Sequence, residues 1–118
     1  IVPAEVPVYL CAADILVNPL STVYPGSVSS KLYEYLAAGK PIISTLGGAN
    51  DEVIENEVNG ILIQKLDGKL FAKAVLRIVE DEELASRLGK AARASALQYT
   101  WEARAQKISE LLEKVMRA

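Results

Sequence analysis

The segment Lys31-Leu32-Tyr33-Glu34-Tyr35-Leu36-Ala37-Ala38-Gly39-Lys40-Pro41-Ile42-Ile43-Ser44-Thr45 joins a helix to a strand through a glycine. Leu32 and Leu36 share one helical face and Glu34 lies on another, which predicts an amphipathic helix over residues 31–38. Gly39 suits the left-handed conformation that often ends a helix. Residues 41–45 then predict a short strand, since proline is tolerated where a strand starts.

The same alternation extends in both directions from this segment. Upstream, residues 6–13 predict a helix, and residues 14–19 a buried strand that stops at Pro19. Downstream we expect a helix capped by Asn50 or Asp51 and reaching residue 56, and then a third strand. This third strand covers residues 61–63, and the remaining predicted elements are helices over residues 70–79, 82–97 and 100–116, the last with Thr100 as its N-cap.

Alternating helices and strands are typical of a parallel α/β sheet. Three strands are about half of a doubly wound, Rossmann-like sheet, here flanked by helices and followed by two long C-terminal helices. We therefore expect the 118 residues to be one partial domain, with the first part of that domain lying outside the chain. The open sheet edge and the apolar faces of the last helices predict self-association of the isolated chain.

Composition narrows the function classes. The net charge is −2 and there is no histidine, which argues against a nucleic-acid partner and removes the commonest general base. A single cysteine, Cys11, fits a reducing compartment, and its apolar surroundings predict a small buried side chain. No apolar run approaches the roughly 20 residues of a transmembrane helix, so a cytoplasmic protein is expected.

The carboxyl edge of the sheet is where an open α/β fold gathers its ligands. Residues 26–30, Gly-Ser-Val-Ser-Ser, lead directly into the helix at Lys31, and free amides at a helix start can hold a phosphate. Glu34, one turn later, could accept hydrogen bonds from the vicinal hydroxyls of a ribose. The alternative is structural: an N-cap serine and a Lys31–Glu34 surface pair. Gly47-Gly48 likewise fits either a tight turn or a close approach to a ligand.

The ordered motifs resemble the donor-site segment of retaining glycosyltransferases with the GT-B fold, the glycosyl transferases group 1. The pattern Glu-Ala-Met-Ala-x-Gly-x-Pro-Val-Val followed by Gly-Gly is matched by residues 34–48, and the later Asn-Gly-x-Leu by residues 59–62. Residues 12–19 are similar to the family's strand that ends in proline, residues 80–89 to its Leu-Gly helix, and residues 99–102 to the start of its closing helix.

The resemblance implies a role for each matching residue. Glu34 would bind the nucleotide ribose, the amides of Ser29, Ser30, Lys31 and Leu32 would hold the diphosphate, and Thr45, Gly47 and Gly48 would lie near the nucleotide. Gly26 stands where many members carry a first glutamate that contacts the transferred sugar, so the donor sugar is not implied. No divalent metal or other cofactor is implied, and no residue of this chain is assigned a catalytic role.

The expected function is therefore binding of a nucleoside diphosphate sugar for retaining hexosyl transfer in a longer enzyme. The acceptor-binding N-terminal domain would lie outside this chain, which alone would be inactive. In the full-length enzyme, peripheral association with the inner face of the membrane is compatible with this expectation. Two alternatives are a sugar-nucleotide epimerase of the same architecture and a non-catalytic α/β interaction module. Base, sugar, acceptor and oligomeric state are left open.

Overall fold

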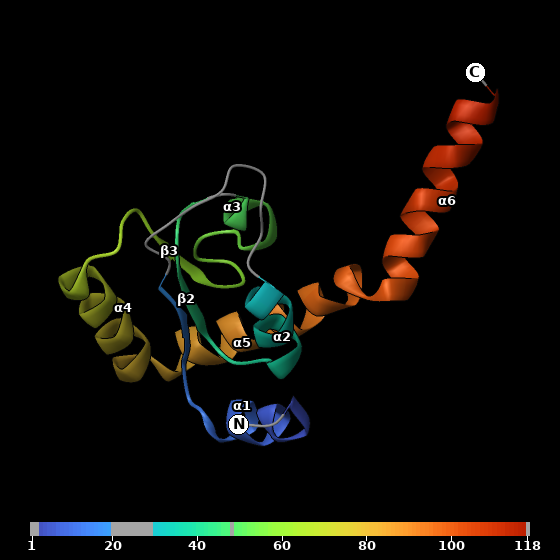
Figure 1. Ribbon diagram of the computed structural model, residues 1–118. Coiled ribbons are helices and arrows are strands. Elements are labelled where there is room, and N and C mark those ends of the chain that lie inside the picture. Colours follow the sequence, from blue (N-terminus) through green and yellow to red (C-terminus); the bar gives the residue numbers. More distant parts are fainter. Residues whose placement is uncertain (1–2, 20–29, 48, 118) are drawn as a thin grey trace.

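The computed structural model describes residues 3–19, 30–47 and 49–117, which form a parallel sheet with helices on both faces (Figure 1). Its strands lie in the order β1 (Leu16–Asn18), β2 (Ile42–Thr45), β3 (Ile61–Ile63). The helices are α1 (Val6–Ala12), α2 (Ser30–Ala38), α3 (Asn50–Val53), α4 (Gly68–Glu80), α5 (Glu82–Ala96) and α6 (Trp101–Arg117), with 3-10 turns η1 (Pro3–Glu5) and η2 (Leu97–Tyr99). The predicted α/β half-sheet and its long C-terminal helices are confirmed.

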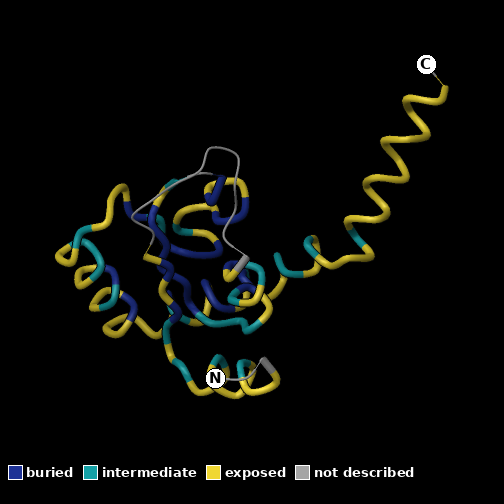
Figure 2. The backbone as a smooth tube through the Cα atoms, in the orientation of Figure 1, coloured by how far each residue is buried: buried dark blue, intermediate teal, exposed yellow. Residues whose placement is uncertain are grey.

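The central strand β2 explains how the core divides into two. Successive side chains of a strand point to opposite faces, and all four residues of β2 are buried. Ile43 packs with residues of β3, α4 and α5 on one face, whereas Ile42 packs with residues of α2 and α3 and with Ala92 on the other. Figure 2 shows the buried positions concentrated along the strands and on parts of the helices around them, as expected for parallel strands covered on both sides.

Helix α5 contributes to both clusters, because Leu88 lies in the first and Ala92 in the second. Its closest partner is the end of α2. A Cβ placed on Gly89 would lie 2.6 Å from the carbonyl oxygen of Gly39, so the two backbones meet where only glycine fits. Gly39 has φ +69°, the left-handed conformation expected of it after the last residue of α2. Arg93 donates a 2.6 Å hydrogen bond to the carbonyl oxygen of Ala37 in the same helix end.

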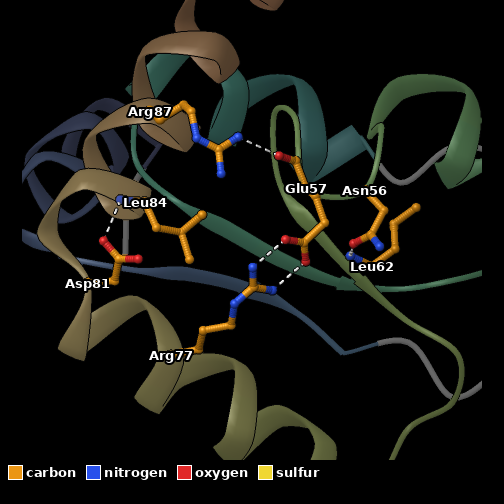
Figure 3. A network of polar contacts seen from close by, with 7 residues as sticks. All are labelled: Asn56, Glu57, Leu62, Arg77, Asp81, Leu84 and Arg87. Carbon is orange, nitrogen blue, oxygen red and sulfur yellow. Dashed lines mark hydrogen bonds and ion pairs between the residues drawn. The ribbon is translucent and has the colours of Figure 1, made fainter.

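The loop between α3 and β3 is attached to both α4 and α5 through Glu57 (Figure 3). Glu57 has φ +70°, which is uncommon for a residue with a side chain. Its carboxylate forms a two-point ion pair with Arg77 of α4, and its carbonyl oxygen accepts a 2.7 Å hydrogen bond from Arg87 of α5. These contacts offset the unfavourable backbone conformation and fix the entry into β3.

Helix α6 extends away from the rest of the protein, and none of its residues is buried (Figure 1). Thr100 begins it as predicted, since its hydroxyl accepts a 3.0 Å hydrogen bond from the amide of Ala103. One face of the helix exposes large apolar side chains, including Ile108 and Leu111. Its amphipathic pattern is therefore present without a packing partner in the described part of the chain. No described helix is both long and apolar enough to span a membrane.

Two local predictions are wrong. The predicted helix from residue 50 to 56 is a single turn, and its N-cap position is Ala49, which makes no side-chain cap; Asn50 lies inside the turn and is buried. Cys11 is exposed, because α1 is a helix with no buried residue. Both differences have the same physical origin: tertiary contacts, which the local sequence does not specify, decide the burial of the apolar run around Cys11 and the length of the helix at Asn50.

Candidate functional site

Helix α2 has one face in the core and the other toward solvent. Leu32 and Leu36 have no exposed surface, whereas Lys31 and Glu34 are exposed. Glu34 therefore points away from the core, as the site prediction requires. Among the described residues, Lys31 and Glu34 form no ion pair within 4.0 Å. The alternative that these two side chains form a surface pair is therefore not supported.

Glu34 lines a groove of about 330 Å³ between α1 and α2. Its walls are mostly apolar, and Glu34 is its one charged residue among those described. The lining residues are Val6, Pro7, Leu10, Cys11, Glu34, Ala37 and Ala38. A concave apolar surface with a single hydrogen-bonding group is the usual character of a small-molecule site, and this volume is at the lower end of the range of about 300–1,000 Å³.

The groove was not predicted from the sequence. Its far wall is α1, and the position of α1 against α2 depends on tertiary packing that no short motif specifies. Its one recognisable signal is the small pair Ala37-Ala38 on the outer face of α2, because side chains this short leave room beside Glu34.

The carboxyl edge of the sheet carries the remaining predicted residues. β1 ends at Asn18 and β2 at Thr45, and α2 begins at Ser30. Thr45 is buried and Gly47 half-buried, and neither lines the groove beside Glu34. The turn after β2 is held at both ends: the amide of Leu46 donates to the carbonyl oxygen of Ile63 at 2.7 Å, and the amide of Asn50 to that of Gly47 at 3.0 Å.

Some predicted contacts fall outside the described structure. Ser29, Gly48 and Gly26 lie outside the described residues, and Ser30 is the first residue of α2. Leu32 is described, and its side chain is in the core, so only its backbone amide could face a ligand.

Tyr35 connects the helix to the first strand. Its hydroxyl donates a 3.2 Å hydrogen bond to the carbonyl oxygen of Val17 in β1. Partial burial raises the pKa of the Tyr35 phenol, and the negative charge of the neighbouring Glu34 raises it further. The phenol therefore stays neutral at physiological pH and acts as a structural donor that ties α2 to β1.

The described residues contain no group of three or more His, Cys, Asp or Glu side chains that could hold a metal ion. What the arrangement offers chemically is a helix start at the sheet's carboxyl edge, an exposed lysine in its first turn and an exposed carboxylate beside an apolar groove. These features suit an anionic group joined to a hydroxylated, partly apolar one.

Comparison with known proteins gives concordant results. Residues 2–95 match the family model of the glycosyl transferases group 1. The chain is 36% identical over 94 residues to the putative glycosyltransferase YtcC of Bacillus subtilis, covering 78% of this chain and 23% of that protein. Among solved structures, it superposes on sucrose-phosphate synthase from Thermosynechococcus elongatus with a TM-score of 0.78 and 29% identity, over 93% of this chain and 27% of the synthase.

A second solved structure has the same fold at lower identity. HepE from Anabaena, in complex with UDP, superposes with a TM-score of 0.80 and 23% identity, over 94% of this chain and 30% of HepE. The chain thus spans about a quarter of the length of the relatives it matches. Since the family model covers most of the sequence, the chain belongs to the glycosyl transferases group 1 family.

Proposed function

We propose that this chain binds the nucleoside diphosphate of an activated sugar, as the donor-binding part of a longer glycosyltransferase. The observation that carries the proposal is the placement of Glu34, whose carboxylate is exposed on α2 beside an apolar groove. The family membership, and a structural relative bound to UDP and to UDP-glucose, support a nucleotide sugar as the ligand. They also favour sugar transfer over the epimerase and the non-catalytic module.

The helix geometry suggests which residues would bind the diphosphate and which would bind the ribose. Ser30 and Glu34 are separated by four residues, or about 6 Å along the axis of an α-helix. The diphosphate would take hydrogen bonds from the amides at Ser29, Ser30, Lys31 and Leu32 at the positive end of the helix dipole. The ribose would lie one turn further along, where the Glu34 carboxylate can accept from both of its hydroxyls.

The same arrangement has a consequence for the transfer step. When the bond from the sugar to the diphosphate breaks, negative charge develops on the leaving phosphate. Amides at the start of α2 and the ammonium group of Lys31 would stabilise that charge without moving. The proposal includes transfer with retention of configuration and without a divalent metal, both of which follow from the family resemblance. Thr45, Gly47 and Gly48 would lie near the nucleotide without an assigned contact.

The acceptor would bind elsewhere. This chain spans 23% of the length of YtcC, so we propose that the remainder of a full-length enzyme supplies the acceptor site and completes the donor site. The chain alone would then bind nucleotide without transferring sugar.

Self-association of the isolated chain also stays a prediction, because α6 exposes an apolar face. Size-exclusion chromatography that gives a monomer at every protein concentration would contradict it.

The test measures UDP and GDP affinity by calorimetry for the unsubstituted chain and for Glu34→Ala. Hydrogen bonds to a charged group contribute about 1.5–3 kcal/mol, so Glu34→Ala should weaken binding roughly 10- to 100-fold. The matched control is Glu113→Ala on the exposed α6, which should bind as the unsubstituted chain does. A nucleotide that lacks both ribose hydroxyls should bind the unsubstituted chain more weakly than UDP does. Glu34→Ala should bind that nucleotide and UDP with similar affinity. Equal binding by Glu34→Ala and the unsubstituted chain would contradict the role of Glu34.

An independent readout uses the single cysteine. Cys11 is exposed and lines the same groove as Glu34. A nucleotide in the groove should therefore slow alkylation of the thiol, measured by mass spectrometry against nucleotide concentration. Alkylation at an unchanged rate in saturating nucleotide would place the ligand outside the groove.

A further inference from the structure

Polar side chains are buried together where β1 and β2 reach the carboxyl edge of the sheet. Asn18, Ser44, Thr45 and Asn50 each have 2% or less of their surface exposed. Asn18 and Ser44 are register partners on neighbouring strands, and Asn50 begins α3 on the other side of the turn. Four buried polar residues at one end of an otherwise apolar sheet are unusual enough to need a physical reason.

The hydrogen bonds among these side chains converge on two backbone carbonyl groups. The amide of Asn18 donates to the Ser44 hydroxyl at 3.1 Å, and that hydroxyl donates to the Thr45 carbonyl oxygen at 3.1 Å. The same oxygen accepts from the Asn50 amide at 3.4 Å, and the Thr45 hydroxyl donates to the Asn18 carbonyl oxygen at 3.4 Å. Every buried side-chain nitrogen and oxygen in the described part of the chain has a partner.

Stability alone does not explain this network. Burying a polar group costs free energy that a hydrogen bond mostly restores, and replacing both partners with apolar groups of similar shape is often neutral or stabilising. Ile42 and Ile43 show that apolar side chains are accommodated earlier in the same strand. A hydrogen-bond network that apolar side chains could replace at little cost in folding free energy is better explained by the groups that it holds in position.

What it fixes is the orientation of the last carbonyl groups of two strands. A carbonyl oxygen turned toward a diphosphate would repel it, since the oxygen has a partial negative charge and the diphosphate is an anion. Here the oxygens of Asn18 and Thr45 are occupied by side-chain donors within the protein. The sheet edge that meets the start of α2 is thereby freed of two groups that would oppose an anion.

We propose that Asn18, Ser44 and Asn50 are positioning residues for the donor diphosphate, acting through the Asn18 and Thr45 carbonyl groups and the turn that follows Thr45. This inference rests on the proposed function, because it assumes that the diphosphate lies at this edge. Its distinctive consequence is that the network matters for the phosphates of the ligand and not for its nucleoside. A general loss of structure would weaken binding of both.

The test compares UDP with uridine for the double variant N18L/S44A of this chain. Denaturant unfolding should give a midpoint equal to or above that of the unsubstituted chain. UDP should bind roughly tenfold more weakly, the effect of about one lost hydrogen bond, and uridine within about twofold, measured by calorimetry and NMR titration. Ser95→Ala is the control: it removes a hydroxyl that accepts a 3.0 Å hydrogen bond from buried Asn59, away from this edge, and should leave UDP affinity unchanged.

Two results would overturn the inference: an unchanged UDP affinity in N18L/S44A, or equal losses for UDP and uridine. If the double variant does not fold, Thr45→Val takes its place in the same comparison of UDP with uridine. This substitution removes only the hydroxyl that donates to the Asn18 carbonyl oxygen. Failure of the unsubstituted chain to bind UDP and GDP would instead contradict the proposed function, and the inference would fall with it.

Discussion

Replacing Gly89 with alanine tests whether the contact between α2 and α5 sets the position of the helix that carries Glu34. The added Cβ would lie 2.6 Å from the Gly39 carbonyl oxygen, 3.4 Å from the Gly39 carbonyl carbon and 3.7 Å from the Lys40 Cα. The first distance is about 0.7 Å shorter than the C···O contacts of about 3.3 Å that proteins tolerate. Since all three neighbours are backbone atoms, relief requires that one helix move.

The magnitude follows from two opposing effects. Overpacking of this kind costs about 1–3 kcal/mol, and alanine in a helix interior is favoured over glycine by about 1 kcal/mol. Because the clash at 2.6 Å is with backbone atoms, the overpacking cost lies in the upper part of that range, at about 2–3 kcal/mol, and the net destabilisation of Gly89→Ala should be about 1–2 kcal/mol. With an m-value of about 2 kcal/mol per M, the urea midpoint would fall by about 0.5–1 M.

The matched control is Gly68→Ala, at the first position of α4. A Cβ there has no neighbour within 4 Å, so the unfolding midpoint should stay the same or rise. Urea unfolding followed by circular dichroism measures both variants. A Gly89→Ala variant as stable as the unsubstituted chain would show that the two helices separate at no cost, and the close contact would then not hold α2 in place.

Three further substitutions test other contacts. Hydrogen bonds from Arg77 lower the pKa of Glu57, so the pair stabilises the fold fully above the ordinary glutamate pKa of about 4.3. This stabilisation is lost as the pH falls through the lowered pKa. At pH 7, Glu57→Gln should therefore unfold at a lower denaturant concentration than the unsubstituted chain, whereas well below pH 4 the two should unfold at the same concentration. Asn59→Ala leaves buried backbone groups without partners and should cost about 2–3 kcal/mol in urea unfolding. Thr100→Ala removes the cap of α6, so far-UV circular dichroism should lose helix while the global midpoint stays, because α6 buries no residue.

Local chemistry accounts for what could be predicted from the sequence. The core face of α2, the stop at Gly39 and the cap at Thr100 each depend on residues within four positions of one another, and all three are confirmed. Glu34 is exposed for the same reason: a residue two positions from Leu32 and Leu36 on a helix cannot share their buried face.

What could not be predicted depends on contacts between distant residues. The Asn-Gly pair at residues 59–60 matches a sequence motif, but the motif gives no sign that the Asn59 side chain donates a hydrogen bond to Ser95 on α5, 36 residues away. The positive φ of Glu57 has no local signal, because two arginines on separate helices favour it. The groove beside Glu34 and the exposure of Cys11 both follow from where α1 packs, which the spacing of its own residues does not determine.

Helix α2 serves the core and the proposed donor site at once, and its two ends are held by separate means. Its C-terminal end meets α5 through Gly39, while its start faces the strand ends that the buried polar network orders. A nine-residue helix is about 14 Å long, so a shift at one end displaces Glu34 unless the other end resists it. Because Gly89 and Ser44 share no hydrogen-bonded partner, their effects on stability should add, whereas their effects on nucleotide affinity should not, since both act on the placement of one helix. Selection for donor binding would then constrain glycines that lie far from any ligand.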